Sequence, residues 1–138
     1  MMYIAFKKCE NNFLEKCIKY FTKSEFVHCE LVSCFCNDTF YGYSAFPGEG
    51  VRSKYIKYDP KVWEFINLKD IKTQDVKKFY EKTKGKKYDY LGVLGFVFGN
   101  HDNPNRYFCS EWCAKALGFN NPSRISPGWL YKYFKGKI

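Results

Sequence analysis

The chain has 138 residues, of which 46% are hydrophobic and 21% are aromatic. This length and composition predict one globular domain with a sizeable core and exclude a disordered chain. The formal net charge of +9 favours anionic partners, but the basic residues are spread from Lys7 to Lys137, so charge alone does not indicate a nucleic-acid site.

The N-terminal segment predicts a strand followed by a helix. Residues 2–7 form a short apolar run, which is typical of a buried strand. Asn11 or Asn12 can cap a helix over residues 12–22. The 3.6-residue period predicts an apolar stripe on one face of this helix and lysines on the other. The stripe comprises Phe13, Leu14, Cys17, Ile18 and Phe21, and the outward lysines are Lys16, Lys19 and Lys23.

Four strands are predicted next. Residues 26–35 are rich in β-branched and apolar side chains, and residues 39–45 return after an Asn37-Asp38 turn, so the two segments predict a hairpin. A further turn leads to a strand near 51–55. The alternating pattern of residues 63–68 predicts the last strand of this group.

The second half of the chain predicts mainly helices. In chain order, we expect a helix over 74–84 capped by Thr73 and ended by Gly85, a helix or turn over 88–96, a polar loop over 100–105, a helix from Cys109 ended by Gly118, and a last helix from Ser126-Pro127 through about Phe134. The whole pattern predicts an α+β fold in a single domain over 1–138, with a mostly antiparallel sheet packed against helices.

The seven cysteines form an odd set, whereas a secreted disulfide framework normally uses an even number. The apolar N-terminal run is too short for a signal peptide, and no apolar run approaches the ~18 residues of a membrane-spanning helix. We therefore expect a reduced, intracellular or cytoplasmic protein. Cys29, Cys34 and Cys36 lie close together without zinc-knuckle spacing, so we expect no metal and no cofactor; a redox or metal protein built on them is the least favoured alternative.

Cys109 is the leading candidate for chemistry because it falls at a predicted helix start. The positive end of the helix dipole lowers the pKa of a thiol and favours the nucleophilic thiolate. Cys113, one turn later, lies inside the helix and is expected to be a core residue. Glu111 is expected to interact with the helix dipole, which leaves the thiol in need of a base from elsewhere in the chain.

His28 is the favoured base, and His101 in the polar loop is the alternative. Strand alternation places Glu30 on the same face as His28, with Cα atoms about 6.5 Å apart. A carboxylate stabilises an imidazolium, so Glu30 is the favoured group to orient the ring. Ser44 or Tyr43 on the neighbouring strand are geometric alternatives, and at most one of them can face His28.

Five short motifs follow one another along the chain. They are Phe26-Val27-His28-Cys29-Glu30-Leu31-Val32, Tyr43-Ser44-Ala45, Gly48-Glu49-Gly50-Val51-Arg52, Tyr88-Asp89-Tyr90-Leu91-Gly92 and Phe108-Cys109-Ser110-Glu111-Trp112. In this order they resemble the circularly permuted branch of the NlpC/P60 papain-like superfamily, which includes YiiX-like and YycO-like proteins and a group of poxvirus proteins. In that branch, as here, the histidine strand precedes the cysteine helix, and the resemblance covers residues 24–118.

The resemblance implies a permuted papain-like fold and a thiol-dependent hydrolase or acyltransferase. Such an enzyme would act on an amide, ester or thioester bond of a peptide, a protein conjugate or a lipid. By motif position, Cys109 corresponds to the nucleophile and His28 to the base. Tyr88 and Ser110 are expected to bind the substrate or its oxyanion.

The chain departs from the superfamily pattern at the third catalytic position. The strand after the histidine carries Tyr43-Ser44-Ala45 where relatives often show a carboxylate. The third member therefore stays open between Glu30, Ser44 and Tyr43. The alternative function is a non-catalytic papain-like module that docks on an anionic membrane or, less favoured, on nucleic acid.

Overall fold

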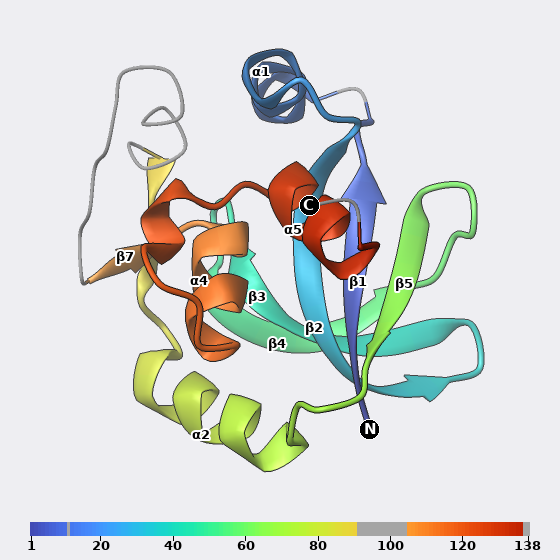
Figure 1. Cartoon of the computed structure of the whole chain (residues 1–138), viewed down its shortest axis with the longest axis vertical. Helices are drawn as coiled ribbons and strands as arrows, with labels where there is room; N and C mark the ends of the chain where they lie inside the picture. The colour runs from blue at the N-terminus through green and yellow to red at the C-terminus, as the bar shows by residue number, and fades with distance from the viewer. Residues whose placement is uncertain (11, 91–104, 137–138) are drawn as a thin grey trace.

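A five-stranded antiparallel sheet forms the centre of the fold (Figure 1). The computed structural model describes residues 1–10, 12–90 and 105–136 of the chain. In spatial order the strands are β4 (Gly50–Lys57), β3 (Thr39–Phe46), β2 (Phe26–Cys36), β1 (Met2–Lys8) and β5 (Trp63–Leu68). The predicted hairpin of β2 and β3 is confirmed, and so are the other three strands. β2 is the central strand, because β1 and β3 pair with its two edges.

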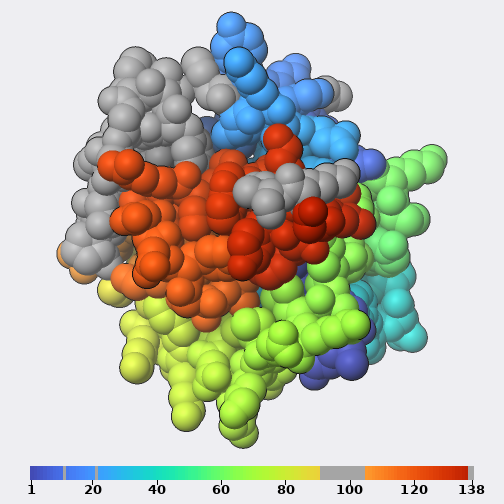
Figure 2. Space-filling view, in the orientation of Figure 1, coloured from blue at the N-terminus to red at the C-terminus, as the bar shows by residue number. Residues whose placement is uncertain are grey.

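The helices lie on one face of the sheet and at its ends, so the α+β class is confirmed (Figure 1). They are α1 (Phe13–Thr22), α2 (Thr73–Thr83), α4 (Cys109–Ala116) and α5 (Pro127–Phe134), with a short 3-10 helix at Pro122–Arg124. α4 and α5 pack on β2. In the space-filling view the C-terminal part of the chain, coloured orange to red, forms a continuous surface (Figure 2). Among the described residues, no helix is both long and apolar enough to cross a membrane.

The core is divided between the two faces of the sheet. The larger cluster lies between the sheet and the helices, and it includes Cys29, Trp112 and Cys113, so the prediction that Cys113 is a core residue is confirmed. A smaller cluster on the other face contains Phe40 and Trp63. β2 therefore has apolar neighbours on both faces, and any charged group on it needs a partner within the protein.

Two local predictions differ from the structure. Phe13 is 83% exposed, whereas Ile18 of the predicted stripe is buried together with Glu15; the Glu15 carboxylate is held there by Lys7 at 2.7 Å. Asn12 does cap α1, since its side chain accepts a hydrogen bond from the Glu15 amide at 2.9 Å. The predicted stripe is therefore confirmed at Ile18 but not at Phe13, whose aromatic ring lies in solvent.

The predicted cap of α2 is also wrong by one residue. The helix begins at Thr73, and Lys72 occupies the N-cap position without a side-chain hydrogen bond. Of the segment predicted as a helix or turn over 88–96, the structure describes residues 88–90: Tyr88 ends a short strand, β6 (Lys87–Tyr88), and Tyr90 is helical. β6 pairs in parallel with β7 (Arg106–Tyr107), which the sequence did not predict. The rest of that segment and most of the predicted loop over 100–105 lie outside the described residues.

Candidate active site

Cys109 is the first residue of α4, as its position in the sequence predicts. Phe108 is the N-cap residue, and its backbone N–H donates a hydrogen bond to the Glu111 carboxylate at 3.3 Å. Glu111 thus places negative charge at the positive end of the helix dipole, in the role expected for it. α4 packs on β2 and β3, which holds the Cys109 thiol 98% buried beside the central strand.

His28 on β2 and the Cys109 thiol lie close enough for the charge of each to act on the other. Burial opposes charge on His28, but the charges of Cys109 and Glu30 outweigh it and raise the pKa of His28 to about 9. Burial likewise opposes ionisation of Cys109. The neighbouring Cys29 thiol and the charge of His28 nevertheless hold the pKa of Cys109 well below its usual range. Both shifts favour the ion pair of a thiolate and an imidazolium.

Glu30 contacts the other side of the same imidazole ring. Its carboxylate is hydrogen-bonded to His28 Nε2, and the side chain is completely buried. Burial alone would raise the pKa of Glu30, but His28 and Arg52 hold it below its usual range. The i,i+2 placement on one strand face thus brings Glu30 and His28 together as predicted. Of the candidates for the orienting group, Glu30 is the one that the structure brings to the ring.

Gly42 on β3 provides the space for this buried carboxylate. A Cβ atom at position 42 would lie 2.7 Å from Glu30 Oε1 and 3.2 Å from the Ile56 side chain. The 2.7 Å contact is closer than non-bonded atoms tolerate and the 3.2 Å contact is tight, so a larger residue would require Glu30 to move. The glycine is thus part of the site, although it contributes no side chain.

Arg52 on β4 is the residue that sequence reasoning missed. Its guanidinium donates two parallel hydrogen bonds of 2.7 Å, one to each carboxylate oxygen of Glu30. It also donates to Glu49 at 3.0 Å. The available signal was its place directly after the buried Val51 in a predicted strand, since an arginine in such a position needs an acidic partner.

Ser44 and Tyr43, the alternatives for the third catalytic position, make other contacts. The Ser44 hydroxyl donates a hydrogen bond of 2.7 Å to the backbone carbonyl of Cys29. The Tyr43 ring packs edge-on against Tyr41 and Tyr80. Both residues therefore support the strands and helices around the site.

Tyr88 lies close enough to Cys109 for the thiolate charge to act on it. Burial and then the charge of Cys109 raise the pKa of Tyr88, so its phenol stays protonated. Tyr88 and His28 both line a cavity of about 290 Å³ with a largely apolar wall, which leaves space for a substrate beside His28. The other lining residues are Asn12, Leu14, Glu15, Ile18, Val27, Phe46, Pro47 and Tyr90.

Ser110 is completely buried, and its hydroxyl oxygen makes no hydrogen bond in the described part of the chain. Its expected role at the substrate or the oxyanion stays a prediction. His101, the alternative base, lies outside the described residues. Cys29 is buried whereas Cys34 and Cys36 are exposed, and within residues 1–10, 12–90 and 105–136 no cluster of three or more potential metal ligands occurs.

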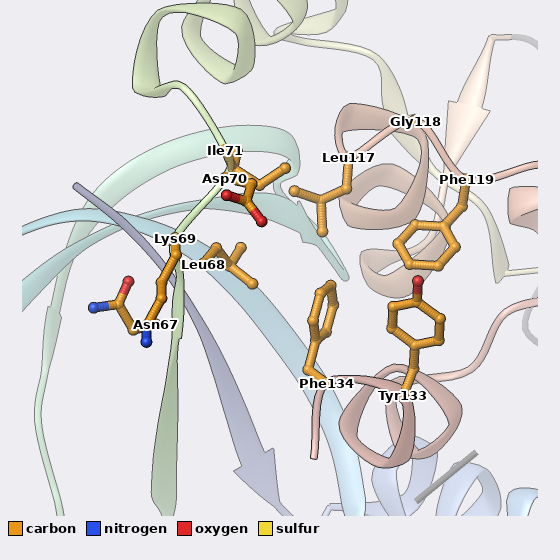
Figure 3. A pocket seen from close by; sticks show the side chains of 10 residues that line it. All are labelled: Asn67, Leu68, Lys69, Asp70, Ile71, Leu117, Gly118, Phe119, Tyr133 and Phe134. Carbon is orange, nitrogen blue, oxygen red and sulfur yellow. The ribbon is translucent and has the colours of Figure 1, made fainter. Parts of the chain in front are cut away.

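A larger cavity of about 480 Å³ lies away from these residues (Figure 3). Leu117 and Phe119 border it at the C-terminal end of α4, opposite the end that carries Cys109. Residues 67–71 and the aromatic rings of Tyr133 and Phe134 complete its wall. None of the candidate catalytic residues lines this cavity, so its size does not make it the active site.

Comparison with models of known protein families gives no match. A comparison with curated proteins gives no match either. The functional conclusion therefore depends on the geometry of Cys109, His28, Glu30 and Arg52.

Proposed function

We propose that this chain is a thiol-dependent hydrolase or acyltransferase with the circularly permuted papain-like fold of the NlpC/P60 superfamily. It cleaves an amide, ester or thioester bond of a peptide or lipid. One observation carries the proposal: Cys109 starts a helix and contacts His28, whose ring is in turn held by Glu30. Nucleophile, base and orienting group are the three parts that thiol-based acyl transfer requires.

The first half of the reaction acylates Cys109. The thiolate attacks the substrate carbonyl carbon, and the carbonyl oxygen becomes an oxyanion. The backbone N–H of Cys109 lies in the first turn of α4, where amides have no partner within the helix, so it is the expected oxyanion donor. The His28 imidazolium then gives its proton to the leaving amine, alcohol or thiol as the scissile bond breaks, and a thioester remains on Cys109.

The second half releases the acyl group. Neutral His28 takes a proton from a water molecule, or from the hydroxyl or amino group of an acceptor, as that nucleophile attacks the thioester carbon. The tetrahedral intermediate collapses with Cys109 leaving as thiolate, which restores the initial ion pair. Water gives hydrolysis and an acceptor gives acyl transfer, so the same three residues serve both reactions.

The contact between Cys109 and His28 favours catalysis over a non-catalytic docking module. A module of that kind has no need for a buried thiolate and imidazolium, which are costly to remove from water unless they are used. The order of the elements supports the permuted fold, since the histidine strand β2 precedes the cysteine helix α4 and packs against it. The largely apolar cavity beside Tyr88 supports a substrate with an apolar group near the scissile bond.

Incubation with p-nitrophenyl acetate, an activated acyl donor, is expected to leave an acetyl thioester on Cys109. The modified position is read by peptide mass spectrometry, because the exposed Cys34 and Cys36 are also open to reagents. A Cys113→Ala variant is the matched control, since it removes another buried thiol one turn along the same helix and should be acetylated at Cys109 like the wild type. Equal total labelling of wild type and Cys109→Ala would contradict the proposal.

A further inference from the structure

We propose that Arg52 is a positioning residue, which keeps Glu30 ionised and turned toward His28 so that the Cys109–His28 pair can carry opposite charges. This inference rests on the proposed function. Its first support is geometric: the two 2.7 Å hydrogen bonds use both oxygens of Glu30, so the carboxylate plane is fixed by the planar guanidinium. A carboxylate fixed in this way presents Oε2 to His28 in one orientation.

The second support is the charge balance of the buried groups. Cys109, His28, Glu30 and Arg52 form a series of neighbouring groups in which negative and positive charges alternate. Cys109, His28 and Glu30 are each at least 95% buried, and the Arg52 side chain is only 13% exposed. With Arg52 in place the series is neutral as a whole, which is the condition under which charges are tolerated away from water.

Removing the guanidinium would leave the series with a net charge of −1. A buried group of that charge takes up a proton, and the thiolate of Cys109 is the most basic anion in it. The other titratable groups around the series come from β2, β6, the residue after β6, and α4: Cys29, Tyr88, Asp89, Glu111 and Cys113. All of these are neutral or acidic. The nearby cation on β4, Lys54, pairs with Glu49 at 3.0 Å and is 46% exposed, so none of these groups replaces the buried charge of Arg52.

Phe46 covers the series on one side. Its ring is edge-on to the His28 imidazole, with centroids 5.3 Å apart, and it lies 5.3 Å from the Arg52 guanidinium carbon. The ring therefore limits the approach of water to the contact between these two cations and Glu30. At the outer end, Arg52 reaches Glu49, whose side chain is 38% exposed. Glu49 marks the point where the series meets solvent, and it provides a control.

The test is the pH dependence of the rate at which iodoacetamide alkylates Cys109, followed on the Cys109 peptide by mass spectrometry. This readout reports the thiolate and needs no substrate. In Arg52→Met, the midpoint of the alkylation rate against pH is expected to move to higher pH by at least about one unit. At pH values below the midpoint, this shift lowers the alkylation rate about tenfold. Arg52→Lys keeps the positive charge but loses the two parallel hydrogen bonds to Glu30, so the midpoint should shift less. Glu49→Gln should leave the profile unchanged.

A double variant separates the electrostatic role from a structural one. Glu30→Gln combined with Arg52→Met removes both charges, so the remaining Cys109–His28 pair is again neutral and its midpoint should move back toward that of the wild type.

Circular dichroism identifies variants that fold. Should Arg52→Met fail to fold, the Arg52→Lys and double variants carry the test. Folded Arg52 variants with the wild-type profile would overturn the role of Arg52, and acetylation of wild-type Cys109 would still support the proposed function. If the profiles of the Arg52 variants shift but wild-type Cys109 is not acetylated, the proposed function alone is overturned.

Discussion

Replacing His28 by alanine is expected to reduce turnover of any ester, thioester or amide substrate by about 10⁴- to 10⁶-fold. The imidazolium stabilises the thiolate, donates the proton that the leaving group needs and later removes one from water, so its loss affects both halves of the reaction. Steady-state hydrolysis of p-nitrophenyl acetate, corrected for the rate of the Cys109→Ala variant, measures the effect.

The second histidine of the chain supplies the control. His101→Ala is expected to retain turnover within a few-fold of the wild type, because His28 already occupies the position of the base beside Cys109. A large loss in His101→Ala together with a small loss in His28→Ala would reverse the two assignments. Losses of similar size in both variants would contradict a single catalytic base.

Replacing Glu30 by glutamine is expected to lower the free energy of unfolding by about 3 to 5 kcal/mol, the usual result of removing one partner from a buried ion pair. Glutamine has nearly the same shape, but it leaves Arg52 and His28 facing a neutral group inside the protein. Urea denaturation followed by circular dichroism at neutral pH measures the loss. Turnover should fall as well, since the imidazole loses the charge that stabilises its protonated form.

Glu49→Gln is the matched control for this stability measurement. It removes a carboxylate from the same guanidinium, but at a position that is 38% exposed, where a salt bridge contributes at most about 1 kcal/mol. Similar losses in the two variants would show that the burial of Glu30 is not what makes its pairing strong. A Glu30→Gln protein as stable as the wild type would contradict the ion-pair assignment.

The main catalytic candidates could be predicted from sequence because their signals are local. A cysteine between an Asn- and Pro-containing loop and an apolar periodic segment predicts a helix start, and Cys109 occupies that position. A period of two along β2 predicts that His28 and Glu30 share a face. Each of these inferences uses the sequence pattern within a single helix or strand, so none of them depends on how the elements pack.

The residues that sequence reasoning missed depend on non-local packing. Arg52 reaches Glu30 across β3, and Gly42 leaves space for the carboxylate only because of the register between the strands. The exposure of Phe13 likewise depends on which side of α1 meets the sheet. The parallel pairing of Lys87–Tyr88 with Arg106–Tyr107 joins two-residue strands, which are too short to show a period.

The central claim is that Cys109 and His28 form a thiolate–imidazolium pair, and ultraviolet absorbance of the thiolate tests it most directly. The difference spectrum between wild type and Cys109→Ser, titrated with pH, is predicted to show thiolate throughout the neutral range and to lose it only in acid, since the pKa of Cys109 is lowered. In His28→Ala the thiolate should appear only in the alkaline range. A wild-type thiolate that first appears at the pH of an ordinary cysteine, about 8.5, would contradict the account.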